Sequence, residues 1–318
     1  MVRVAIAGGS GEVAQEVIDA LVASKEHEIV ILSRNGQGSS NSNPHNLEWR
    51  QVNYGDVNSL AQALGGIHTV LSFVQLLQDP GNKAQKNLID ASILASVARF
   101  APSEWGSRAA GSVMPWWTGK DEVKEYLRQV NATEKVLEYT LFQPGLFLNY
   151  LATPHKTSKH LAPLNTFVDF HNRRAIVVDG IDTIMTFTTV QDMAAVVAKA
   201  VGFEGQWPAV GGIRGNRVAV SQLIEIGTRV RGGPFSVDTV KLEDLEAGSL
   251  TTSWKLEAQH HSVSGDEAEK LLRSVLVGTL LSSAKGYWDV SDEWNQLLPG
   301  HQFADIEEFL EMAWVGKP

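Results

Sequence analysis

Small residues recur at a spacing of three near the N-terminus of the 318-residue chain, where Gly8, Gly11 and Ala14 form a G-x-x-G-x-x-A array. The array stands between a short apolar run and a segment with helical spacing, which predicts a strand, a turn and a helix. In such a turn the glycines let the backbone approach a pyrophosphate, and the helix presents free N–H groups to it. We therefore predict a dinucleotide site, although a turn that only joins strand to helix is the alternative. The residues expected to contact the cofactor here are Gly8, Gly9, Ser10, Gly11, Glu12 and Val13.

The residues after the second expected strand select the kind of dinucleotide. Folds that bind NAD usually place a carboxylate there for the ribose 2′-hydroxyl. This chain has Ser33-Arg34-Asn35 instead, and no Asp or Glu occurs between Ile29 and Asn46. A guanidinium can neutralise a 2′-phosphate and donate two hydrogen bonds to it. NADP(H) is therefore favoured, with Arg34 and Asn35 as contacts, and the alternative is that Arg34 is a solvated loop charge.

Strands and helices alternate through the first half of the chain, which predicts a parallel sheet covered by helices on both faces. The expected strands are Val2–Ala7, Glu28–Ser33, Leu47–Tyr54, Ile67–Val74, Ala98–Ala101 and Tyr139–Gln143. The expected helices are 11–23, 56–64, 80–97 and 119–130, and residues 34–46 read as a polar loop. The fold class is therefore α/β, a Rossmann doubly wound parallel sheet.

In this fold class ligands bind at the carboxyl ends of the strands, near the switch in strand order. Two strand ends therefore supply further candidates for the cofactor site. Those after the fourth expected strand are Ser72, Phe73 and Gln75, and those after the sixth are Gln143 and Pro144.

The alternation is lost after about residue 144, where the segment 144–170 has no clean period. Further on, short strands are expected at 175–178, 185–188 and 236–242, and helices at 190–201, 220–230, 267–281 and 305–314. We interpret residues 1–150 as an NADP-binding domain. Residues 151–318 are expected to form a smaller C-terminal α+β substrate lobe, interleaved with the first domain without a clear linker.

Composition excludes several classes of function. The formal charge of −9 disfavours nucleic acid and anionic membranes as partners, and the absence of cysteine excludes thiolate catalysis and disulfides. The histidines have no metal-ligand spacing, so no metal is expected. No signal peptide or membrane span is expected either, so a cytoplasmic protein with a small-molecule substrate is the default. The oligomeric state is left open.

The segment Arg99–Gly106, R-F-A-P-S-E-W-G, resembles the R-F-x-P-S-E-[FW]-G signature of the isoflavone reductase-like and NmrA-like proteins, which are atypical short-chain dehydrogenases/reductases. The glycine turn, Ser33-Arg34 and the ending 303–310 are also similar to that family. The resemblance implies a Rossmann domain with a C-terminal substrate lobe. It also implies a catalytic lysine on the helix after the motif, and the matching position is Lys120, with Lys124 one helical turn further on as the rival.

A lysine amine can polarise a carbonyl or supply a proton as hydride arrives, best when its pKa is lowered toward neutrality. Without the resemblance, a lysine on an amphipathic helix is most often a surface charge. Ser103 could assist as a hydrogen-bond donor, or could be a turn residue beside Pro102. We assign Lys120 and Ser103 to catalysis and both of them, with Pro102, to the cofactor site.

Aromatic residues near these positions are the expected substrate contacts. Trp116-Trp117 precede Lys120 and could line a flat aromatic ligand, or could pack between the two lobes. The full set of expected substrate contacts is Trp105, Trp116, Trp117, Phe147 and Tyr150.

The leading hypothesis is an NADPH-dependent reductase of a small, largely apolar, aromatic or polyketide-like metabolite, which would reduce a C=C, C=O or benzylic centre. One alternative is an NmrA-like regulatory protein that senses NADP(H) without turnover. Another is a non-redox isomerase or lyase on the same fold. The lysine at position 120 argues against the regulatory hypothesis, because such members tend to lose it.

Overall fold

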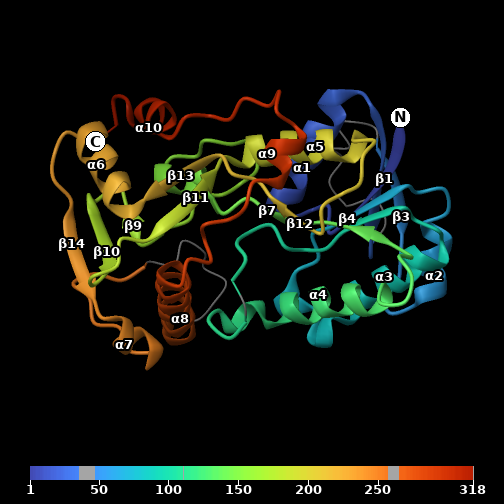
Figure 1. Cartoon of the computed structure of the whole chain (residues 1–318), viewed down its shortest axis with the longest axis horizontal. Helices are drawn as coiled ribbons and strands as arrows, with labels where there is room; N and C mark the ends of the chain where they lie inside the picture. The colour runs from blue at the N-terminus through green and yellow to red at the C-terminus, as the bar shows by residue number, and fades with distance from the viewer. Residues whose placement is uncertain (36–46, 110, 257–264, 318) are drawn as a thin grey trace.

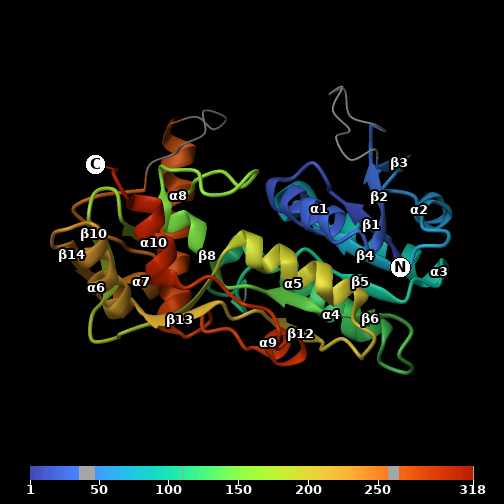
Figure 2. The same cartoon turned by 90° about the horizontal axis from the view of Figure 1, so that it is seen from above.

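The structure, a computed structural model, describes residues 1–35, 47–109, 111–256 and 265–317. Its largest sheet has six parallel strands in the order β3-β2-β1-β4-β5-β6, all of which are labelled in the second of the two views (Figures 1 and 2). Their bounds are β1 Val2–Ala7, β2 His27–Ser33, β3 Glu48–Gln51, β4 Thr69–Ser72, β5 Arg99–Ala101 and β6 Glu138–Tyr139. The strands β2 and β3 lie on one side of β1, and the strands from β4 onward lie on its other side. The pair β1 and β4 is therefore the switch in strand order at which such sheets bind ligands.

Helices cover both faces of this sheet (Figures 1 and 2). α1 (Glu12–Ser24) and α5 (Val190–Gly202) pack on one face, and α2 (Val57–Ala63), α3 (Lys83–Leu94) and α4 (Thr118–Val130) on the other. Because side chains alternate along a strand, Val4 and Ile6 of β1 join the α1 and α5 core, whereas Ala5 and Ala7 join the opposite core. The predicted α/β class with a doubly wound parallel sheet is confirmed.

The second lobe is built from short strands and helices around its own core. Two strand groups are paired here, β14-β10-β9 and β13-β11-β8, whereas the pair β12-β7 lies against the core of α1 and α5, to which Phe142 of β7 belongs. The strands are β7 Leu141–Gln143, β8 Leu146–Phe147, β9 Val168–Asp169, β10 Arg174–Val178, β11 Ile184–Thr188, β12 Val210–Gly212, β13 Asn216–Ala219 and β14 Ser236–Val240. The helices after α5 are α6 Val220–Val230, α7 Leu242–Glu246, α8 Gly265–Ala284, α9 Glu293–Leu297 and α10 Ile306–Trp314. Trp294 of α9 belongs to the core of α1 and α5.

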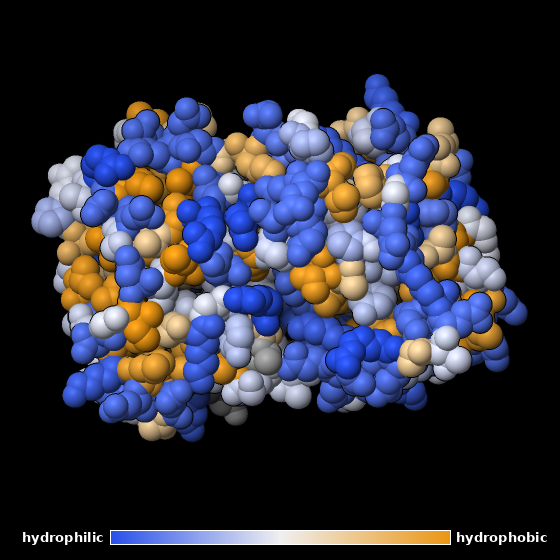
Figure 3. All heavy atoms as spheres, in the orientation of Figure 1, coloured by the Kyte–Doolittle hydropathy of each residue, from blue (hydrophilic) through white to orange (hydrophobic). Residues whose placement is uncertain are grey.

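The two lobes exchange elements along the chain. α5 follows the start of the second lobe in sequence but packs against α1, and Val113 and Met114 from the first half lie in the core of the second lobe. On the face shown in Figure 3, hydrophilic residues spread over both lobes, with hydrophobic residues in groups among them. None of the helices within the described ranges combines the length and the apolar character needed to cross a bilayer.

Some expected elements have other bounds. The expected sixth strand 139–143 is divided, because β6 pairs with β5 whereas β7 pairs with β12. The helix expected from Pro80 begins at Lys83, because Pro80–Asn82 form a 3-10 turn in which Gly81 has a φ of 67°. It ends at Leu94 and not near Val97, and Ser96 beyond it has a φ of 54°. Most of the loop expected at 34–46 lies outside the described residues.

Candidate active site

Two adjoining cavities of about 560 and 400 Å³ lie at the carboxyl ends of β1 and β4. Their linings share five residues, so we treat the cavities as one feature, the switch-point groove. The shared residues are Ser10, Gly11, Phe73, Val74 and Gln75. Because Ala7 pairs with both Leu32 and Ser72, the three strands end level and their following turns meet at this edge.

The glycine turn forms the middle of the groove. Gly8 has a φ of 77°, and a Cβ at this position would lie 2.7 Å from the carbonyl oxygen of Phe73. The Gly11 N–H donates to the Gly8 carbonyl oxygen at 3.1 Å, and Gly11 gives α1 no side-chain cap. The first N–H groups of α1 therefore remain available for an anion at this position.

The acidic side chain in the first turn of α1 is directed to another segment of the chain. The Glu12 carboxylate accepts a hydrogen bond from Ala162 N at 2.9 Å. One turn later, Glu16 accepts from His160 N at 2.6 Å and from Leu161 N at 3.1 Å. The segment 160–162 is thereby held against α1, and Leu161 contributes to the wall of the larger cavity.

The smaller cavity carries the residue expected to choose the cofactor. Arg34 and Asn35 line it and are exposed, as the sequence predicts for residues that meet a ligand or solvent. Tyr54 lines the same cavity, donates to the Leu32 carbonyl oxygen at 3.3 Å, and has its pKa raised to about 12 by burial. Asp79, which also lines it, accepts hydrogen bonds from Ala84 N and Gln85 N at the start of α3. Its carboxylate charge is therefore stabilised by main-chain N–H groups.

The larger cavity contains Lys120, which α4 holds at 6% exposure. Its Nζ donates to the main-chain oxygen of Glu104 and lies 3.6 Å from the ring centroid of Trp117. Burial lowers the pKa of Lys120 to about 8, while the negative charge of Glu104 acts in the opposite direction. Ser103 lines the same cavity, and its N–H donates to Gln85 Oε1 at 3.0 Å.

Aromatic rings form much of this cavity. Trp105 stacks on Phe73 at 4.3 Å, and its Nε1 donates to the Ser72 carbonyl oxygen at 2.8 Å. Trp116 and Trp117 line the cavity and also pack against the core of the second lobe. The two tryptophans therefore pack between the lobes and also line the cavity, and their contact with a ligand stays a prediction.

The structure brings most of the expected site residues into the groove. The lining includes the expected residues Gly8, Gly9, Ser10, Gly11, Glu12, Val13, Arg34, Asn35, Phe73, Gln75, Ser103, Trp105, Trp116, Trp117, Lys120 and Tyr150. Five expected residues are buried next to it and are not part of the lining, namely Ser72, Pro102, Gln143, Pro144 and Phe147. Gln143 belongs to β7, which pairs away from the main sheet, and the Phe147 ring packs edge-on against Tyr150 at 5.8 Å.

Other lining residues had no signal in the sequence. Leu76 and Leu77 follow β4 in a 3-10 turn, and Tyr54 and Trp49 come from segments read only as strand. Leu161 reaches the groove only because α1 binds the main chain around it. Glu104 is part of the P-S-E motif that the sequence analysis singled out, but its burial could not be predicted from that motif.

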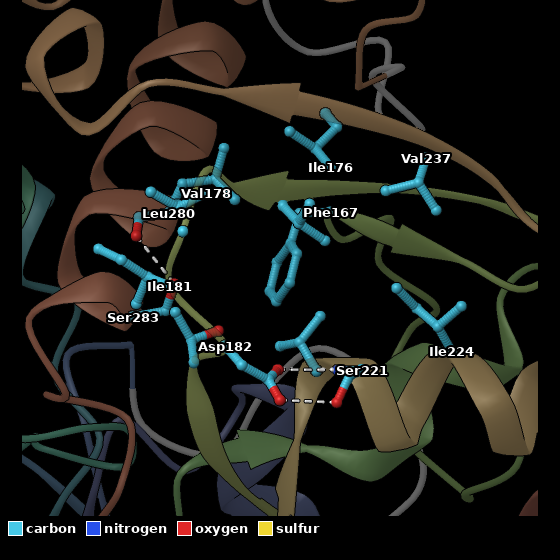
Figure 4. Close-up of a pocket in the computed structure, with 14 residues that line it drawn as sticks. Phe167, Ile176, Val178, Ile181, Asp182, Ser221, Ile224, Val237, Leu280 and Ser283 are labelled. Carbon is cyan, nitrogen blue, oxygen red and sulfur yellow. Dashed lines mark hydrogen bonds between the residues drawn. The ribbon is translucent and has the colours of Figure 1, made fainter.

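A separate cavity of about 390 Å³ lies in the second lobe (Figure 4). Apolar side chains from β10, α6 and α8 surround it, among them Ile176, Ile224 and Leu280. Its carboxylate, Asp182, accepts from Ser221 N at 3.1 Å and from Ser221 Oγ at 2.7 Å, so it serves the start of α6. It contains none of the residues with predicted chemistry. Within the described ranges, no group of three or more His, Asp or Glu side chains could hold a metal ion.

Known proteins share both sequence and fold with this chain. Oxidoreductase BOA1 of Botryotinia fuckeliana is 32% identical over 237 residues, which cover 73% of this chain and 77% of that protein. Oxidoreductase swnN of Metarhizium robertsii is 26% identical, with 100% of this chain and 98% of that protein covered.

Two solved structures share the fold over 98% of this chain. AtPrR2 with NADP+ and (+)pinoresinol has a TM-score of 0.71 at 16% identity, with 98% of that chain covered. The Escherichia coli NADPH-dependent quinone oxidoreductase QOR2 with NADPH has a TM-score of 0.69 at 20% identity, with 99% of that chain covered. The sequence model of the NmrA-like family matches residues 2–310. The chain therefore belongs to the NmrA-like family.

Proposed function

We propose that this protein is an NADPH-dependent reductase of a small, largely apolar metabolite of aromatic or polyketide-like character. One observation carries the proposal: a continuous groove at the switch point has a glycine turn in its middle, Arg34 toward one end and Lys120 toward the other. The names of the related oxidoreductases and the NADP(H) in the two solved structures support it.

The residues present fit the dinucleotide. A Cβ at Gly8 would fill the close approach between this turn and Phe73, and the N-terminus of α1 has no side-chain cap. These features suit a pyrophosphate, and Arg34 would hold the 2′-phosphate that distinguishes NADP(H). The chemistry that this cofactor supplies when bound is hydride donation.

Lys120 would complete the reduction by giving a proton. For a C=C or C=O group the net change adds one hydride and one proton across the double bond. At a benzylic C–O bond the hydride goes to carbon, the C–O bond breaks and the proton goes to the departing oxygen. In each case the N–H bond that breaks is on the Lys120 ammonium. With a pKa of about 8, this amine is mostly protonated near pH 7 and still releases a proton readily. Ser103 would assist as a hydrogen-bond donor near the nicotinamide.

The lining of the larger cavity supports the substrate class. Besides Lys120 it includes three tryptophans, three leucines, a tyrosine and a phenylalanine, which favour a flat apolar molecule. The structure of AtPrR2 with both NADP+ and (+)pinoresinol supports a small-molecule substrate beside the cofactor. The reducible group could be an enone C=C, an aryl ketone or a benzylic centre.

Calorimetry with NADPH and NADP+, followed by NADPH oxidation assays with enones, quinones and aryl ketones, tests the proposal. Binding of the cofactor with turnover of at least one apolar substrate is expected. Tight binding without oxidation by any substrate would instead favour a sensor of NADP(H). Turnover that persists without NADPH would favour an isomerase or lyase. If neither NADPH nor NADP+ binds, both the reductase and the NADP(H)-sensor hypotheses are excluded.

A further inference from the structure

Lys120 is held by two groups that attract its charge without being able to take its proton. Its Nζ donates to the main-chain oxygen of Glu104 and lies above the face of Trp117. Both contacts favour the ammonium form and fix its position. The protonation equilibrium of Lys120 can therefore be changed further only by the charged side chains nearby.

Glu104 places a carboxyl group in the same buried cluster. Its side chain is 1% exposed, its Oε2 has no hydrogen-bond partner, and the nearest cation is Lys124 Nζ at 3.6 Å. Burying a carboxylate with so little compensation costs free energy, so its position calls for a role. Burial raises the pKa of Glu104, while the charges of Lys120 and Lys124 oppose that rise.

Lys124 links the cluster to the surface. It lies one helical turn after Lys120 on α4, is 21% exposed, and pairs with Asp121 Oδ1 at 3.4 Å. The other oxygen of Asp121 accepts from Gly111 N at 2.6 Å. Glu104 therefore contacts both lysines, Lys120 through its main chain and Lys124 through its side chain.

The charges that act on Lys120 have opposite signs. Glu104 and Asp121 favour its protonated form, and Lys124 disfavours it. Across the cavity, Glu12 is the other charged residue of the described lining, and its carboxylate is engaged with Ala162 N.

We propose that Glu104 and Lys124 are paired positioning residues that act on Lys120 in opposite directions, the Glu104 carboxylate retaining the Lys120 proton and the Lys124 ammonium promoting its release. The inference deepens the proposed function, because it matters for catalysis only if Lys120 is the proton donor. Neither side chain needs to touch the substrate.

Glu104→Gln and Lys124→Met remove one charge each and nearly preserve side-chain size. The test measures the titration of Lys120 in the full-length protein labelled with carbon-13 lysine, with the resonance assigned by its loss in Lys120→Arg. The acid dissociation constant of Lys120 is expected to rise about tenfold in Glu104→Gln and to fall by a similar factor in Lys124→Met. Glu122→Gln and Lys86→Met, an ion pair at 3.4 Å between α4 and α3, are the matched controls and are expected to leave it unchanged.

Shifts in the same direction, or no shift in either variant, would overturn the inference. If Glu104→Gln does not fold, as judged by circular dichroism, Lys124→Met alone decides, because its Lys120 must hold the proton to higher pH. The alkaline limb of the pH profile for substrate reduction separates the two proposals. If the titration of Lys120 shifts and the alkaline limb of the pH profile does not move with it, the inference about Glu104 and Lys124 stands and Lys120 is not the proton donor. If the titration of Lys120 is unshifted in every variant and the alkaline limb of the pH profile follows it, the proposed function stands and the inference about Glu104 and Lys124 fails.

Discussion

Lys120 is subject to two opposing effects, burial and the negative charge of Glu104. Burial prevails and lowers its pKa to about 8. A proton donor acts only while it is protonated, so reduction is expected to be full below this pH and to fall about tenfold per pH unit above it. Lys120→Met is expected to lose at least about 100-fold in kcat while calorimetry still detects NADPH binding. An activity that stays flat well above pH 8, or a fully active Lys120→Met, would remove this residue from the chemistry.

Arg34 acts at the other end of the groove, through charge and not through burial. Because it is exposed and lines the smaller cavity, Arg34→Gln is expected to remove contacts to the 2′-phosphate with little effect on folding. A hydrogen bond to a charged group contributes about 1.5–3 kcal/mol, so NADP+ binding should weaken roughly 10- to 100-fold. NAD+ binding to the same variant is the internal control and should be unchanged. Equal weakening of both cofactors in calorimetry would assign Arg34 a general structural role.

Residues of this kind could be identified from the sequence because their signals are local. The glycine spacing, the missing carboxylate after the second strand and the P-S-E motif each lie within a few neighbouring positions. Leu161 and the buried state of Glu104 could not be predicted, because each depends on chain segments that meet only after folding. The groove itself was expected at the strand ends, yet Ser72 and Gln143 are buried and are not part of its lining. The Ser72 hydroxyl donates to Gln85 Oε1, and Gln143 belongs to β7, which pairs with β12.

In the turn between β1 and α1, the backbone conformation and the close contact with Phe73 exclude a side chain at Gly8. Gly8 has a positive φ, and a Cβ there would also meet the Phe73 carbonyl oxygen at 2.7 Å. Gly232 has a φ of 65° and no heavy atom within 4 Å of such a Cβ, so it isolates the backbone effect alone. Gly232→Ala is expected to lower the free energy of unfolding by about 1–2 kcal/mol. Gly8→Ala should lower it by roughly 1 kcal/mol more, because β1 and β4 must shift apart.

Urea unfolding measures this difference, and NADP+ calorimetry on the same two proteins adds a functional readout. Cofactor binding should be lost in Gly8→Ala and kept in Gly232→Ala. Equal stability losses with intact binding in both would show that the turn tolerates a side chain.

The bounds of elements were the least predictable feature at this scale. The apolar run Tyr139–Gln143 looks like one strand, but its two ends pair with different partners, β5 and β12. β12 contains Gly211 and Gly212, which let it pass close to the side chain of Thr140 and to the segment around Ser291. A pattern within five residues contains no information about a partner strand 69 positions further along the chain. By contrast, α1 and β1 were read correctly to within a few residues because period and turn agree there.

Across the whole molecule, the interleaving of the lobes means that the sheet of the first half depends on later sequence. α5 covers one face of that sheet. Its large buried side chains are Val190, Met193, Val196, Val197 and Val201. Their burial contributes roughly 7–15 kcal/mol, which matches the whole stability of a typical domain.

A fragment of residues 1–150 contains the cofactor motif and all six strands of the main sheet, but it lacks α5 and β12. Without α5, α1 would lose the helix against which it packs, and β7 would lose its partner strand β12. We expect this fragment to show no cooperative thermal transition by circular dichroism and no NADP+ binding, whereas the full chain shows both. A cooperative transition in the fragment would mean that the first half folds independently and that the second lobe is an attachment. The fold predicted from strand and helix order is therefore necessary for the site but not sufficient, because the energy that holds the groove in shape comes from contacts between the two halves of the chain.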